Sequence, residues 1–289
     1  MFVGFMKEVR KIDKEFLALE DKTEKIILRY ERLIKKGYKN ALDEMRKEIA
    51  KLYESYSDSE GKLTLEEMNK YNRMDNLKKV IATTLGALYI AHRQETNKAL
   101  REIYGFNANE AVSIIKKPLG EFANIRINFD GILKKLDVDK VINEEMAGLN
   151  WAVRLGKHRV DVIYNVERTV REGLYNGDTY KTMATRLKDS LEGDVINPTK
   201  IVRTESGRVM QQASLDIMDQ VSQHVKVWKR WKTSGDEVVR KSHRILNNTE
   251  IPYDELFTFS DGTQTPAPRV SGSPQNVINC RCILSYRFE

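Results

Sequence analysis

Two cysteines and a histidine in the last part of the sequence are the residues best suited to chemistry. Cys280 and Cys282 are the only cysteines among the 289 residues, and a single arginine separates them. Together with His243, and with Asp236 as a fourth group, they offer ligand types that zinc accepts. These residues raise the hypothesis of a small zinc site.

The pattern around the two cysteines favours a different interpretation. Between Ile278 and Phe288 the apolar residues fall on every second position, except at Ile283, which is typical of a half-buried β-strand. A Cys-x-Cys pair on a regular strand chelates a metal poorly, and free cysteines are common in protein cores. We therefore expect a strand at residues 278–288 with Cys280 and Cys282 in the core and no cofactor, and zinc is the alternative.

Charged residues of the same region also suit phosphodiester chemistry, as in a nuclease or a transferase. His243 would be the general base, with Glu205 as its partner carboxylate. Arg240 or Arg281 would bind a phosphate. The sequence contains no phosphate-binding glycine loop and no serine-hydrolase motif beside them.

The simpler interpretation of these charges is structural. Asp236 stands at the start of a short predicted helix, where the free N–H groups favour a carboxylate. Arg240 and His243 are three residues apart and would share one face of that helix. With Arg203 and Glu205, these residues would form the ion pairs and caps that hold a small module together, and we expect no catalytic residue.

The elements that must position these residues are mainly helices. Apolar residues recur at alternating steps of three and four from Val9 to Leu33, and in a new phase from Tyr38 to Tyr56, which indicates helices with a heptad seam. Gly37 lies between the two seams and predicts a break there. Further helices are expected at residues 65–103, 108–117, 137–176, 180–191 and 197–221, with a short strand at 125–129.

The composition changes at about Val225. A strand with Val227 and Trp231 comes first, followed by a short helix at 237–246, a loop rich in proline and glycine, and the strand at 278–288. The predicted fold class is mainly α, with a long helical N-terminal bundle followed by a small C-terminal α+β module. The predicted division is a helical region at 1–130, a helical stem at 131–224 and the module at 225–289.

The charge balance is basic, with a formal net charge of +7 and a sequence pI of about 9.1. This favours an anionic partner such as nucleic acid, although a lysine-rich helical protein would show the same balance. The sparse use of cysteine indicates a reducing compartment. The sequence has no apolar run of about 18 residues, so we expect synthesis in a cytoplasm and no membrane segment.

One set of residues follows a recognisable order along the second half of the sequence. The set is Arg203, Glu205, Trp228, Trp231, Asp236, Arg240, His243, Asn279, Cys280, Arg281 and Cys282. In this order it resembles the head-morphogenesis, or Mu F-like minor head protein, family of tailed bacteriophages. Trp151 and the run from Gly173 to Asp178 also fit, so the resemblance covers about residues 145–289.

The resemblance implies a minor structural protein of a phage head, present in few copies at the portal vertex or inside the procapsid. The implied roles are in head morphogenesis, viral assembly and DNA packaging or ejection, without enzymatic turnover. The expected partners are the phage portal protein, the major capsid or scaffolding protein, and double-stranded DNA, whose phosphates a basic chain would tolerate. The expected location is the virion head interior, and the host cytoplasm during assembly.

The sequence departs from the family pattern where zinc ligands are concerned. Many members carry additional cysteines near the Asp-to-His segment, where this chain has Val239 and Ser242. Some have a histidine before the Asn-Cys-Arg-Cys motif, where this chain has Gln275 to Ile278. Two further hypotheses stay open: a toxin-like nuclease or transferase delivered with the DNA, and a helical scaffold with a small zinc module.

Overall fold

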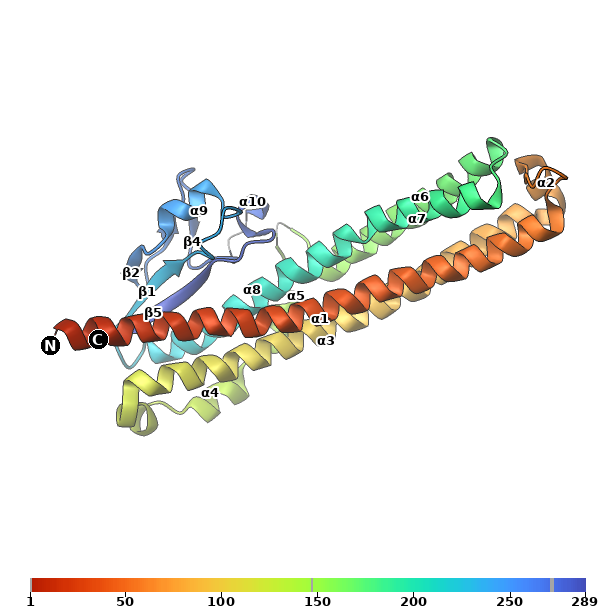
Figure 1. The fold of residues 1–289 in the computed structure, drawn as a ribbon. Helices are drawn as coiled ribbons and strands as arrows, with labels where there is room; N and C mark the ends of the chain where they lie inside the picture. Colours follow the sequence, from red (N-terminus) through yellow and green to blue (C-terminus); the bar gives the residue numbers. More distant parts are fainter. Residues whose placement is uncertain (1, 147, 271–272) are drawn as a thin grey trace. The chain divides into compact units, whose positions relative to one another are not determined.

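The structure is a computed structural model that describes residues 2–146, 148–270 and 273–289. It confirms the predicted fold class, since long helices are followed by a small region of antiparallel strands (Figure 1). The helices are α1 (Phe2–Tyr56), α2 (Leu65–Asn69), the 3₁₀ turn η1 (Lys70–Asn72), α3 (Arg73–Arg126), α4 (Phe129–Lys135), α5 (Val138–Asn143), α6 (Trp151–Tyr175), α7 (Tyr180–Asp194), α8 (Ile196–Val221), α9 (Lys241–Leu246) and α10 (Pro274–Val277).

The strands all lie in the C-terminal part of the described chain. They are β1 (Val227–Lys232), β2 (Glu250–Pro252), β3 (Phe257–Thr258), β4 (Gln264–Thr265) and β5 (Ile283–Phe288). An antiparallel sheet has the order β2-β1-β5, and β3 pairs with β4. In β1, buried positions alternate with half-buried ones, so this strand places one row of side chains in the core of the module.

The chain forms two compact units that are discontinuous in sequence. Unit 1 comprises residues 1–29, 97–150 and 202–289, and unit 2 comprises residues 30–96 and 151–201. Helices α1, α3 and α8 each contribute to both units. These units differ in kind from the predicted division at residues 130 and 224, which follows the order of the sequence and stays a prediction.

The predicted break at Gly37 is wrong, because α1 runs without interruption from Phe2 to Tyr56. The buried positions form one continuous seam: Ile12, Phe16, Leu19, Thr23, Ile27, Tyr30, Ile34, Tyr38, Ala41, Met45 and Ile49. Gly37 allows α1 and α3 to pack closely within unit 2. A Cβ atom there would lie 2.9 Å from Leu88 Cδ1 and 3.3 Å from His92 Nε2.

The helix predicted at 65–103 is interrupted at η1, where Tyr71 has a φ of 51°. Its predicted end near Ile103 is also wrong, since α3 continues to Arg126 with a kink at Gly120, whose φ is 53°. The polar side chain of Asn107 is satisfied within the helix, because its Nδ2 donates to the Ile103 carbonyl oxygen and its Oδ1 accepts from Thr23 Oγ1. The strand predicted at 125–129 does not form. Instead Asn128 caps α4 by accepting a hydrogen bond from the Gly131 N–H.

The predicted start of a helix after Thr64 is confirmed. Its hydroxyl accepts a hydrogen bond from the Glu67 N–H at 3.2 Å. The carboxylate of Glu67 pairs with Lys70 and Arg73 instead of completing a capping box. In the part of the chain that the structure describes, no helix is long and apolar enough to cross a membrane.

The core of unit 2 contains a histidine whose titration predicts a pH dependence. His92 is 3% exposed and packs on Tyr38, and burial lowers its pKa to about 4. The unfolded chain therefore binds more protons between pH 6.5 and pH 4, so the folded state loses about 3 kcal/mol as the pH falls through this window. In urea titrations at several pH values, His92→Gln is expected to flatten this dependence, whereas the exposed His224→Gln leaves it unchanged. Equal slopes for wild type and His92→Gln would contradict the assignment.

Candidate functional site

A histidine and a pair of cysteines from separate segments of the sequence meet in the C-terminal module. The Sγ atoms of Cys280 and Cys282 lie 3.6 and 3.5 Å from Nδ1 of His243. The three potential ligand atoms lie within 4.8 Å of one another, and all three residues are buried. We refer to His243, Cys280 and Cys282 as the His-Cys-Cys cluster.

The backbone around the cysteines differs from the strand predicted at 278–288. Strand β5 begins only at Ile283, so Cys280 and Cys282 lie in an irregular segment before it. Asn279 has a φ of 54°, in the left-handed region that asparagine tolerates better than most residues. Its N–H donates to Thr204 Oγ1 of α8 at 3.3 Å. This local bend removes the objection that a regular strand makes a poor chelate.

The helix predicted at 237–246 is shorter in the structure. Helix α9 begins at Lys241 with Arg240 as its N-cap residue, so Asp236 and Arg240 lie in the preceding loop and not on one face with His243. Both residues connect this loop to the cysteine segment. Nη2 of Arg240 donates to the Ile278 carbonyl oxygen, and Asp236 forms a 2.5 Å ion pair with Arg281. The two segments that supply the cluster are thereby held together.

Aromatic side chains enclose the imidazole of the cluster. His243 is 1% exposed, and its ring centroid lies 5.6 Å from that of Trp231 and 5.2 Å from that of Phe259. Trp231 also packs edge-on against Phe257 and Phe259. The imidazole is therefore fixed in orientation, with Nδ1 toward the two thiols.

The remaining sequence-predicted residues lie apart from His243 and are engaged elsewhere. Glu205 is fully buried and pairs with Arg208 at 2.9 Å. Arg203 pairs with Glu24 of α1. The half-buried Trp228 lies beneath the guanidinium of Arg287. Arg240, His243 and Arg281 line one small cavity, whereas Glu205 is not among the described residues that line it. The structure therefore groups His243 with both candidate arginines but does not place this carboxylate with them.

The thiols of the cluster titrate differently from one another. The pKa of Cys280 is lowered well below its usual value, first by a hydrogen bond from Cys282 and then by His243 and the charge of Arg269, against the effect of burial. The same hydrogen bond, followed by burial, raises the pKa of Cys282. Cys280 is thus the cysteine of the pair that loses its proton more readily, even though its side chain is buried.

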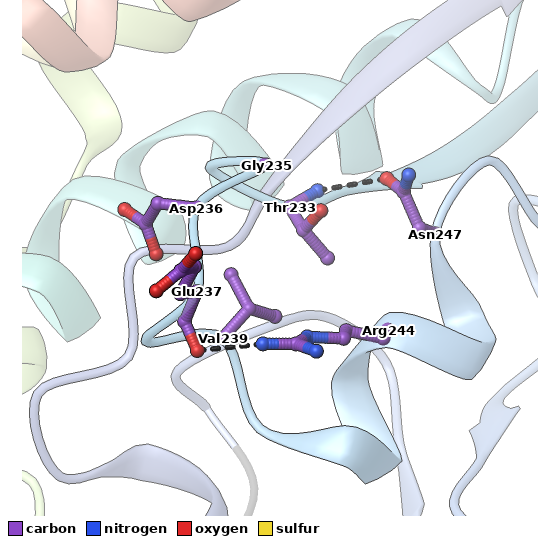
Figure 2. Close-up of a pocket in the computed structure, with 7 residues that line it drawn as sticks. All are labelled: Thr233, Gly235, Asp236, Glu237, Val239, Arg244 and Asn247. Carbon is purple, nitrogen blue, oxygen red and sulfur yellow. Dashed lines mark hydrogen bonds between the residues drawn. The ribbon is translucent and has the colours of Figure 1, made fainter.

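Two cavities adjoin the loop before α9. The larger, of about 400 Å³, is lined by Thr233, Gly235, Asp236, Glu237, Val239, Arg244 and Asn247 (Figure 2). Its lining is tied internally, since Arg244 donates to the Glu237 carbonyl oxygen and the Thr233 N–H donates to Asn247 Oδ1 (Figure 2). The smaller, of about 20 Å³, is lined by residues that include the whole His-Cys-Cys cluster. This volume suffices for about one water molecule.

A buried ion pair that the sequence does not reveal supports the module from α1. Arg269 is 3% exposed and pairs with Glu20 at 2.6 Å. It crosses α8 at Gly207, where a Cβ atom would lie 2.9 Å from Nη1 of Arg269. The partners are 249 positions apart, so no local pattern could predict the contact. The pair of Glu205 and Arg208, by contrast, has the i, i+3 spacing that a helix brings together.

Comparison with known proteins places this geometry in a family. Residues 164–285 match the family described as Phage Mu protein F like protein. The match contains the His-Cys-Cys cluster and the polar residues of α8 and of the loop that surround it. Over this region the chain is similar to the Mu F-like family.

A curated relative extends the likeness beyond the Mu F-like region. Minor head protein GP7 of Bacillus phage SPP1 is 26% identical over 271 residues, which is 94% of this chain and 86% of that protein. The family match at residues 164–285 lies within the expected resemblance at 145–289, and the similarity to this relative also includes the N-terminal helices. Together the family and this relative support a minor head protein of a phage, a component of the virion head.

A second relative shares only part of its length with this chain. The NAD(+)--arginine ADP-ribosyltransferase EFV of Enterococcus faecalis is 28% identical over 157 residues, which is 54% of this chain but only 31% of that protein. More than two thirds of that protein thus lies outside the shared region. No solved structure matches the chain.

Proposed function

We propose that this Mu F-like chain acts at the portal vertex or inside the procapsid, where it aids head assembly by binding and not by turnover. The observation that carries this proposal is the similarity to a minor head protein over 94% of the chain. The portal protein is the principal partner, with the major capsid or scaffolding protein as a further contact.

The state of the polar residues in the Mu F-like region supports binding over catalysis. His243 is enclosed by aromatic rings, and Glu205 is buried against Arg208. Arg240 and Arg281 hold backbone and carboxylate groups of the module itself. These contacts favour a folded anchor, and they disfavour the alternative of a nuclease or transferase that uses the same side chains.

An exposed face of α6 in unit 2 is the surface that we assign to portal binding. Val153, Val160, Tyr164 and Tyr175 are 43%, 60%, 64% and 80% exposed. At about 100° per residue, their spacing places all four on one side of the helix. We call these four residues the α6 stripe. The exposed Lys157 and Arg171 lie on the same side, between these four residues. Exposed apolar and aromatic side chains interspersed with arginine are typical of protein interfaces.

A pull-down against the portal protein of the same phage tests this proposal. We expect binding that persists from low to moderate salt, because burial of apolar side chains is screened little by ions. The double variant Val160→Glu with Tyr164→Glu is expected to weaken binding by at least about tenfold. Ile90→Glu is the matched control, since Ile90 is 62% exposed on α3 of the same unit but lies outside the stripe.

The salt dependence separates specific docking from charge attraction. Binding that disappears at moderate salt, or that the α6 stripe variant leaves unchanged, would overturn the proposed portal contact. Contact with packaged DNA is a second part of the proposal, supported by the net charge of +7. The affinity for DNA should fall steeply as the salt concentration rises, because each phosphate contact releases a counterion.

A further inference from the structure

We propose that the His-Cys-Cys cluster is a binding site for a zinc-class divalent metal ion. Zinc takes thiolate ligands at about 2.3 Å and imidazole nitrogen at about 2.0–2.1 Å in tetrahedral geometry, which separates neighbouring nitrogen and sulfur ligands by about 3.6 Å. In the structure, His243 Nδ1 lies 3.6 Å from Cys280 Sγ and 3.5 Å from Cys282 Sγ. Both nitrogen–sulfur separations therefore already have the value that a bound ion requires.

The donor set fits zinc in charge as well as in geometry. Two thiolates and a neutral imidazole bring two negative charges, which a divalent ion neutralises. A neutral site is the favourable arrangement where the ligands are buried. The buried charge of Arg269 is already paired with the carboxylate of Glu20. Soft thiolate ligands select zinc over magnesium or calcium, which prefer oxygen.

The cluster is held in place by contacts outside it. The left-handed Asn279 turns the chain so that both cysteines face His243, and Thr204 of α8 fixes that turn. Trp231 and Phe259 fix the imidazole ring. Since these contacts do not involve the metal, little rearrangement is needed on binding, and the affinity benefits from this preorganisation.

A small cavity beside the ligands offers space for a fourth ligand. The cavity of about 20 Å³ adjoins all three ligands and has room for about one water molecule. Three protein ligands and one water complete a tetrahedral site. The ion would join α9, which carries His243, to the segment before β5, which carries both cysteines, and would thereby strengthen a module that has short strands and a long loop.

Metal analysis of the full-length chain, purified without a histidine tag under reducing conditions, tests the proposal. We expect about one zinc ion per chain. Because the chain has only two cysteines, cobalt substitution should give a thiolate-to-cobalt charge-transfer absorption that can arise only from Cys280 and Cys282. Cys282→Ser and His243→Ala should lose most of the bound metal. His224→Ala is the matched control, since His224 is an exposed histidine near the module.

Stability measurements keep the test valid if a variant unfolds. In the wild-type chain, chelation should lower the thermal midpoint, and added zinc should restore it, because an ion that binds only the folded state stabilises it by mass action. Folded, reduced wild-type protein without bound zinc, without the cobalt absorption and with no response to chelator would overturn the metal site. That result would leave portal binding untouched, because the α6 stripe shares no residue with the cluster.

Discussion

Replacing Trp231 by alanine is expected to lower the free energy of unfolding by about 3–5 kcal/mol, which is the usual cost of removing a fully buried tryptophan. Trp231 is 0% exposed and contacts Phe257, Phe259 and the imidazole of His243. Its removal would leave a cavity at the centre of the module, between β1 and the segment that carries the cluster. Urea unfolding followed by circular dichroism measures the change.

Trp228 provides the matched control for this substitution. It lies three positions away on the opposite face of β1, is half-buried, and stacks beneath Arg287. Trp228→Ala should cost about 1 kcal/mol, since it removes a half-buried cation–π contact and little of the core. If Trp231→Ala lowers the free energy of unfolding no more than Trp228→Ala does, Trp231 is not central to the packing of the module.

Replacing Glu20 by glutamine is the second substitution with a large expected effect. It leaves the guanidinium of Arg269, 2% exposed, without its carboxylate partner. Breaking a buried ion pair from one side costs about 3–5 kcal/mol, because the remaining charge stays desolvated. We expect a loss near the lower end of this range, since the side chain of Glu20 is 17% exposed.

A double substitution distinguishes the charge effect from a packing effect. Glu20→Gln combined with Arg269→Met removes both charges and should recover part of the stability lost in Glu20→Gln. Asp21→Asn is the control, because it removes an exposed carboxylate one residue away on α1. If Glu20→Gln proves as mild as Asp21→Asn, or the double variant is no more stable, the buried pair is not what holds Arg269 in place.

The long helices could be predicted from sequence because their signal is local and repeated. The steps of three and four predicted most of the α1 seam, and Thr64 predicted the start of α2. Gly37 misled the prediction, because glycine at a helix break and glycine at a helix contact look alike in sequence. Only the approach of Leu88 in space distinguishes them.

The site could be predicted only in part. His243, Cys280 and Cys282 were candidate ligands by residue type, but the alternating pattern continued through both cysteines and indicated a strand. The bend that ends the strand pattern before Ile283 is held by a hydrogen bond from Asn279 to Thr204, which lies 75 positions earlier in the sequence. A hydrogen bond between such distant residues leaves no trace in local periodicity. Arg269 and Glu20 were missed for the same reason.

The central claim is that this Mu F-like chain is a portal-associated component of the phage head. The most direct test is quantitative mass spectrometry of procapsids from the phage that encodes it, prepared with and without the portal gene. The account predicts a few copies of the chain per particle when the portal is present and a strong loss when it is absent. Equal amounts in both preparations, or absence from both, would contradict it.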